Sequence, residues 1–148
     1  MNQTNRITEA FGPHLVMDGY GCPPEVLSNL DLLYEFLNTM PDTMGMTKIM
    51  PPYVFKYRGK VLEDWGLSGF VLIAESHISV HTFPDKGYVS IDAFSCKDFD
   101  HAKFRFIAAK MFQIQRVDAQ LLERGLEFPR NVEVVRDHMT EERATLHA

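Results

Sequence analysis

The stretch from Ala74 to Cys96, AESHISVHTFPDKGYVSIDAFSC, decides the fold of this 148-residue chain. β-forming residues occupy 76–82 and 88–95, and the turn signal Pro-Asp-Lys-Gly at 84–87 separates them. This pattern predicts a β-hairpin with one strand on each side of the turn. The stretch also contains a Glu-Ser peptide bond, two histidines and a cysteine, so we expect it to carry the chemistry as well.

The flanking sequence predicts further elements around this hairpin. Four more extended segments are expected, at 14–20, 51–57, 66–74 and 115–122. Apolar residues recur at three- and four-residue spacing in two amphipathic helices, at 25–40 and 99–113. Pro41 is expected to end the first helix and Asp98 to cap the second, while residues 1–12 and the charged tail from Arg130 are interpreted as loose.

Strands and helices in this order predict a single α+β domain over residues 1–148. Its form would be a two-layer sandwich, a largely antiparallel sheet with two helices on one face. The other face of the sheet then needs cover, and a homodimer that stacks sheet on sheet would provide it.

Composition limits the class of partner and the compartment. The net charge of −5 argues against a nucleic-acid partner, because phosphate binding needs clustered Lys and Arg. With only Cys22 and Cys96, free thiols in a reducing cytoplasm are simpler than a disulfide framework. No apolar run approaches the length of a membrane span, so we expect a cytoplasmic protein without membrane contact.

The Glu75-Ser76 bond is a candidate for self-cleavage. Ser76 Oγ would attack the Glu75 carbonyl and convert the amide into an ester through an oxyanion, which a hydroxyl such as Ser68 could stabilise. His81 is the candidate base for removing the Ser76 α-proton, since imidazole transfers protons near neutral pH. Elimination and hydrolysis would leave a covalent pyruvoyl group in place of Ser76.

A pyruvoyl carbonyl forms a Schiff base with an amine and accepts the electrons released when CO₂ leaves. The substrate is therefore expected to be a small amino acid or a derivative of one. Reprotonation of its α-carbon needs a proton donor, and Cys96 is the candidate.

Other interpretations of these residues remain open. His77 and His81 share one strand face with Ser79, so they could be wet surface residues or a metal pair completed by Cys96, although their spacing matches no standard zinc pattern. We expect no metal. Strict alternation places Ser76 and His81 on opposite faces, and the mechanism requires Ser76 to lie in a turn where the strand starts.

At these residues the sequence resembles the short prokaryotic S-adenosylmethionine decarboxylases, which are self-cleaving pyruvoyl enzymes. The likeness is carried by the stretches GPHLVMDGYGC at 12–22, LSG at 67–69, AESHISVHTFP at 74–84 and DAFSC at 92–96. It implies cleavage between Glu75 and Ser76 into a β chain of 1–75 and an α chain from 76 to 148. It also implies that Ser68 and His81 act in processing, that Cys96 donates the proton during decarboxylation, and that a two-layer α+β protomer dimerises with active sites near the interface.

Two departures from the family pattern concern the substrate. Asp85 stands where the family commonly has a Glu for the ribose hydroxyls, and Trp65 is the aromatic residue near the position where the family places a Phe against adenine. The acidic pair Glu63 and Asp64 would suit the far cation of arginine or ornithine, although surface solvation also explains it.

The sequence therefore predicts a pyruvoyl-dependent S-adenosylmethionine decarboxylase that supplies the aminopropyl donor for spermidine synthesis. A decarboxylase of arginine or ornithine is the alternative. A small-molecule-sensing module that is never cut is a third hypothesis.

Overall fold

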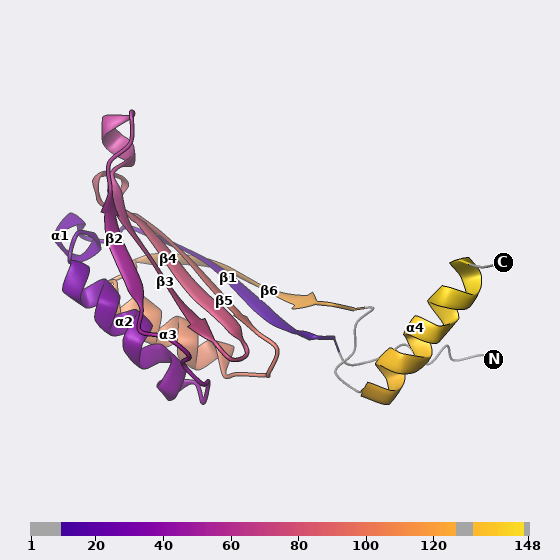
Figure 1. Cartoon of the computed structure of the whole chain (residues 1–148). Coiled ribbons are helices and arrows are strands. Elements are labelled where there is room, and N and C mark those ends of the chain that lie inside the picture. Colours follow the sequence, from indigo (N-terminus) through magenta and orange to yellow (C-terminus); the bar gives the residue numbers. More distant parts are fainter. Residues whose placement is uncertain (1–9, 127–131, 147–148) are drawn as a thin grey trace.

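The structure, a computed structural model, describes residues 10–126 and 132–146 (Figure 1). Six strands pair antiparallel in the order β2-β3-β4-β5-β1-β6. The strands are β1 Gly12–Tyr20, β2 Tyr53–Tyr57, β3 Gly66–Ile73, β4 Ser76–Phe83, β5 Tyr88–Ser95 and β6 Arg116–Arg124. The α-helices are α1 Pro24–Leu27, α2 Leu30–Thr43, α3 His101–Met111 and α4 Val132–Leu146, with short 3-10 helices η1 Leu62–Asp64 and η2 Pro84–Lys86.

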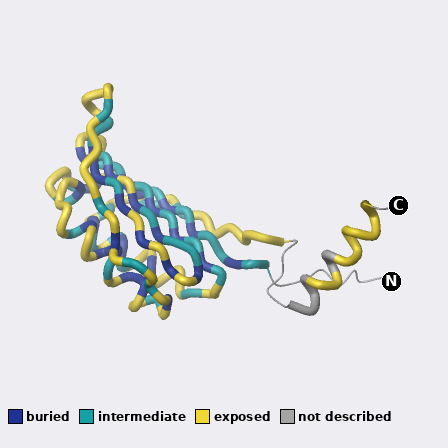
Figure 2. Tube along the Cα trace, viewed as in Figure 1, coloured by how far each residue is buried: buried dark blue, intermediate teal, exposed yellow. Residues whose placement is uncertain are grey.

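The two main helices, α2 and α3, lie on the same face of the sheet, as Figure 1 shows. Alternate residues of the strands point toward them and are fully buried, among them Ile78 and Val80 of β4. The ring of Phe36 on α2 meets Phe104 and Phe112 edge-on and closes this core. Buried residues lie along the strands and under the helices, whereas β6 is largely exposed (Figure 2). The predicted α+β sandwich with two helices on one face is confirmed.

Strand β4 lies inside the sheet and bonds to β3 on one side and β5 on the other. In this register Ser68 of β3 lies opposite His81, and Ser95 of β5 lies opposite Ser76. Ile78, Val80 and Thr82 face the helices and are buried. The intervening residues, including His77 and His81, therefore lie on the face of the sheet that α2 and α3 leave open.

The helix boundaries differ from the sequence prediction for local reasons. The helix expected at 25–40 is two helices, because the Asn29 side chain caps a new start by accepting from Leu32 N–H at 3.1 Å. Pro41 lies within the last turn of α2 and does not end it. Asp100, and not Asp98, is the N-cap of α3, since its carboxylate accepts from Lys103 N–H at 2.9 Å.

The C-terminal segment was expected to be loose, and that is wrong for residues 132–146, which form α4. The sequence there lacks a clear apolar stripe but contains Glu, Arg, Met and Ala, which are good helix formers. Of the expected lead-in at 1–12, only residues 10–12 are described, and Gly12 already belongs to β1. None of the helices within 10–126 and 132–146 has the length and apolar character to cross a membrane.

Phe36 provides a test of this core. Phe36→Ala should lower the free energy of unfolding by about 3–5 kcal/mol, because it removes a fully buried ring and leaves a cavity. Urea denaturation followed by circular dichroism measures the change. Tyr34→Ala, on the exposed side of the same helix, is the control and should cost less than about 1 kcal/mol. Equal losses in the two variants would contradict the packing described here.

Candidate active site

The Glu75-Ser76 bond lies at the tight reversal between β3 and β4, where Ala74 and Glu75 form the turn. Two-residue hairpin turns normally use Gly or Asn, because their central residues take positive φ. Neither Ala74 nor Glu75 does so, and Ser76 instead adopts a φ of 156°, which L residues rarely adopt. The sequence prediction required Ser76 to lie in a turn where the strand starts. Ser76 is instead the first residue of β4, directly after the two turn residues, and it pairs in register with Ile73 and Ser95.

The carbonyl of Glu75 is held by a backbone donor from the neighbouring strand end. Cys96 N–H, directly after β5, donates to Glu75 O at an N···O distance of 2.8 Å. This carbonyl is the one that Ser76 Oγ would attack, so the Cys96 amide already points at the atom on which negative charge would develop. Cys96 itself carries a half-buried free thiol.

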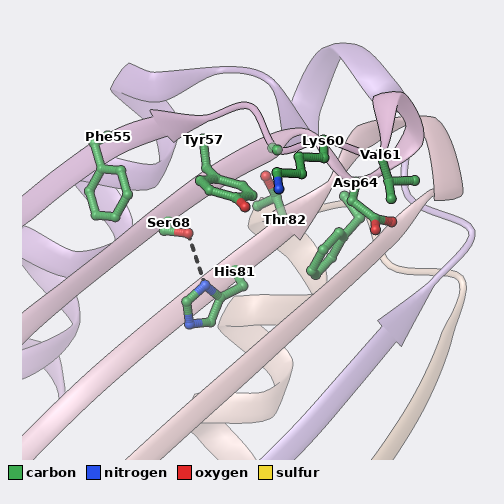
Figure 3. Close-up of a pocket in the computed structure, with 11 residues that line it drawn as sticks. Phe55, Tyr57, Lys60, Val61, Asp64, Ser68, His81 and Thr82 are labelled. Atoms are coloured by element: carbon green, nitrogen blue, oxygen red, sulfur yellow. Dashed lines mark hydrogen bonds between the residues drawn. The ribbon is translucent and has the colours of Figure 1, made fainter.

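The Ser68 and His81 side chains form a second group on the open face. Ser68 Oγ lies 2.9 Å from His81 Nδ1, across the β3-β4 pair (Figure 3). Both residues line a pocket of about 760 Å³. Its remaining lining residues are Phe55, Tyr57, Gly59, Lys60, Val61, Asp64, Gly66, Thr82 and Phe83. A volume of this order suits a small ligand, and the aromatic side chains offer apolar contact.

These two groups lie at opposite ends of β4. Ser76 and His81 are five residues apart along one extended strand, which corresponds to about 16 Å. The structure thus places Glu75, Ser76 and Cys96 together, and Ser68 with His81, but keeps the two sets apart within one chain. His81 of the same chain cannot reach the Ser76 α-proton without a large rearrangement.

The residues expected to contact substrate lie around η1 and η2, at the His81 end of the sheet. Asp64 lines the pocket and forms an ion pair with Lys86, which raises the pKa of that lysine mainly through the hydrogen bond. Glu63 and Asp85 are exposed. Trp65 lies under the Lys56 ammonium, 4.9 Å from the ring centroid, and lines a smaller pocket of about 220 Å³.

The metal alternative has no geometric support in the described residues. His77 and His81 are four residues apart on β4, about 13 Å, and cannot share one ion. No group of three or more His, Cys, Asp or Glu residues within the described ranges is arranged to hold a metal.

A linked set of polar side chains near Ser76 was missed from the sequence. His14 Nε2 lies 3.1 Å from Asp92 Oδ1, and His14 Nδ1 lies 3.0 Å from Arg124 Nη1. Because arginine only donates, Nδ1 accepts, and the ring proton resides on Nε2 and is donated to Asp92. The His77 ring meets His14 edge-on. Burial is the main cause that lowers the pKa of His77, Arg124 adds to it, and Asp92 opposes it.

The residues missed from the sequence differ in whether a sequence pattern could have placed them at the site. Phe83 alternates with His81 on β4, so the period of a strand could have placed it on the same face. His14, Asp92 and Arg124 belong to three strands that meet only through the register of the sheet. Nothing local in the sequence indicates that register.

Fold and site together describe a small two-layer α+β protein with a constrained turn at its Glu75-Ser76 bond. The profile of the S-adenosylmethionine decarboxylase family matches residues 13–125. The chain belongs to this family.

Relatives and a solved structure agree with the assignment. The S-adenosylmethionine decarboxylase proenzyme of Thermococcus gammatolerans is 37% identical over 118 residues, covering 73% of this chain and 78% of that protein. The S-adenosylmethionine decarboxylase proenzyme of a Thermoanaerobacter species is 33% identical over 130 residues, covering 85% of this chain and 97% of that protein. The crystal structure of the adenosylmethionine decarboxylase from Aquifex aeolicus superposes with a TM-score of 0.66 at 28% identity, covering 80% of this chain and 93% of that one.

The lowered pKa of His77 predicts a stability change in mild acid. Below the ordinary histidine pKa of about 6.5 the unfolded chain binds a proton at His77, whereas the lowered pKa of His77 in the folded chain opposes this binding. The free energy of unfolding therefore decreases as the pH is lowered through this range. His77→Gln should therefore lose less unfolding free energy than the wild type between pH 7.5 and 5.5, measured by urea denaturation. Ser79→Ala, on the same face of β4 without a titratable group, should keep the wild-type dependence. A His77→Gln slope as steep as the wild type would contradict the assignment.

Proposed function

We propose that this chain is a self-processing S-adenosylmethionine decarboxylase whose covalent pyruvoyl group is made from Ser76. One observation carries the proposal: the Glu75 carbonyl sits in a constrained turn with the Cys96 N–H bonded to its oxygen at 2.8 Å. Membership of the family supports the activity. Cleavage gives a chain of residues 1–75 and a chain of residues 76–148, both parts of one catalytic domain.

Cleavage starts when Ser76 Oγ attacks the Glu75 carbonyl carbon. The oxygen of that carbonyl becomes an oxyanion, and the Cys96 N–H is positioned to donate to it. The C–N bond between residues 75 and 76 then breaks, the nitrogen takes a proton, and an ester joins Glu75 to the Ser76 side chain. Loss of the Ser76 α-proton expels Glu75 as a free carboxylate, and water replaces the residual amine, released as ammonia, with a carbonyl.

The base for this α-proton comes from a second copy of the chain. Within one chain the Ser68-His81 pair is about 16 Å from Ser76 along β4. The open face that carries the pair also exposes large apolar side chains along β2 and β3, including Tyr53, Phe55 and Leu72. A two-fold dimer that covers this face would present the His81 of each copy to the Ser76 of the other.

The finished pyruvoyl group supplies an electron sink for decarboxylation. In the proposed dimer, residues of both copies would hold the substrate around it and manage the proton. Cys96 lies beside residue 75 and is the proposed proton donor, with its thiol half-buried at the reacting end of β4.

Among the possible substrates, the pocket favours S-adenosylmethionine. Its wall combines the rings of Phe55, Tyr57 and Phe83, which suit a nucleoside better than a plain amino acid. Asp64 is already paired with Lys86, which leaves it less suited to the cation of arginine or ornithine. Asp85 and Trp65 remain the proposed contacts to ribose and adenine. The product would serve spermidine synthesis in the cytoplasm.

Ser76→Ala tests the cofactor and the activity together. Intact-mass spectrometry of the wild type should show two chains, the second beginning with a pyruvoyl group, and the protein should release CO₂ from S-adenosylmethionine. Ser76→Ala should remain a single chain without measurable turnover, because both the nucleophile and the cofactor precursor are gone. A Ser76→Ala chain that still splits after residue 75 would refute the assignment. CO₂ released from arginine or ornithine instead would establish the alternative substrate.

Co-expression of two inactive variants tests the shared site. His81→Ala alone and Ser76→Ala alone should both stay uncut. In a mixed dimer the intact His81 of the Ser76→Ala chain faces the Ser76 of the His81→Ala chain, so random pairing should cut up to about half of the His81→Ala chains. Differently tagged chains separated by mass provide the measurement. The double variant Ser76→Ala/His81→Ala is the control partner and should restore nothing; absence of cutting in both mixtures would contradict a shared site.

A further inference from the structure

The Glu75 side chain is the one buried carboxylate at the scissile turn, and the proposed cleavage gives it no chemical role. Glu75 is 8% exposed, and its Oε2 accepts a hydrogen bond from the backbone N–H of Thr47 at 3.0 Å. A carboxylate is removed from water in this way only at a cost that its new hydrogen bonds must offset. Its position therefore calls for an explanation.

The segment that receives Glu75 is firmly attached to the rest of the fold. Ala74 N–H donates to Thr47 O at 2.8 Å, and Lys48 forms a bridge with Ile73 at the end of β3. The Lys48 ammonium in turn donates to the carbonyl of Asn38 on α2, at 3.1 Å. Thr47 and Lys48 thus connect the turn to a helix that packs in the core.

The scissile turn is consequently held from two sides. On one side the Thr47 segment bonds to the backbone of Ala74 and to the side chain of Glu75. On the other side Cys96 N–H bonds to the Glu75 carbonyl. Two fixed points on residue 75, one on its side chain and one on its carbonyl, restrict rotation of the peptide plane between them.

We propose that the Glu75 carboxylate is a positioning residue for self-cleavage: its bond to Thr47 N–H keeps the Glu75 carbonyl aligned with the Cys96 amide and within reach of Ser76 Oγ. This inference rests on the proposed function. Small displacements of a reacting group lower rates strongly, by about 100-fold for 1 Å, so a side chain that only aligns the carbonyl has a measurable effect.

The same contact has a second consequence once the chain is cut. Thr47 and Glu75 both belong to the chain of residues 1–75, whereas Cys96 belongs to the other chain. The bond from Thr47 therefore survives cleavage and holds the new C-terminus beside β4. Loss of the bond should slow cleavage far more than it slows turnover by enzyme that has already been cut.

Self-cleavage of freshly translated chains, followed over time by mass, tests the inference. Glu75→Gln keeps an acceptor oxygen at the same position and should cleave within about 3-fold of the wild-type rate. Glu75→Met has a similar length without that oxygen and should cleave about 10- to 100-fold more slowly. Thr47→Ala is the matched control and should behave as the wild type, because the donor is the backbone N–H. For chains already cut, CO₂ release per cut chain should stay within about 3-fold in every variant.

The outcomes separate this inference from the proposed function. An uncut wild type would refute the function itself. A cut wild type with Glu75→Met equally fast, or with Glu75→Gln as slow as Glu75→Met, would overturn the positioning role alone. If Glu75→Met does not fold, hydrogen exchange of the Thr47 amide in the uncut Ser76→Ala background tests whether the Thr47-Glu75 hydrogen bond forms. Protection of this amide should be lost in Ser76→Ala/Glu75→Ala and kept in Ser76→Ala/Glu75→Gln. Equal exchange in Ser76→Ala and both double variants would overturn the inference.

Discussion

The pairing of β4 with both of its neighbours is the constraint on which the rest of the structure depends. It places Ser68 opposite His81, Ser95 opposite Ser76, and the Cys96 amide against the Glu75 carbonyl. A slip by one residue would turn Ile78 and Val80 out of the core and move every polar residue of β4 to the wrong face. Because the core fixes the register so strongly, the same apolar residues that stabilise the sheet also align the residues that we propose to react.

The secondary structure around β4 could be predicted from the sequence because the signals for it are local. The turn at 84–87, the alternation along β4 and the apolar stripe of α2 each lie within a few residues. The turn and the strand were placed correctly, whereas the helix predicted at 25–40 begins at Leu30 as α2 and continues to Thr43. The error over the N-cap of α3 has the same local origin, because Asp98 and Asp100 are equally good caps by type and only backbone geometry chooses between them.

The parts that the sequence could not provide are long-range. Thr47 is 28 residues from Glu75, and Arg124 is 110 residues from His14, so their contacts arise only when the sheet closes. The distance between the two reactive groups is the clearest case. Ser76 and His81 are close together in the sequence, as is Ser68. Because β4 is extended, however, each residue between Ser76 and His81 adds about 3.3 Å to the distance between them.

The sheet also shows how a chain cut at the proposed site would remain one protein. Cleavage after Glu75 would break a bond at the end of a two-residue turn. Strand β4 would keep its hydrogen bonds to β3 of the chain of residues 1–75 and to β5 of its own chain. The buried side chains of β4 stay packed against α2, which belongs to the chain of residues 1–75. Burial of this kind stabilises by about 25 cal/mol per Å² of apolar surface, so the interface between the two products is a segment of the core itself. The fold would thus tolerate loss of the one covalent bond whose proposed cleavage creates the reactive group.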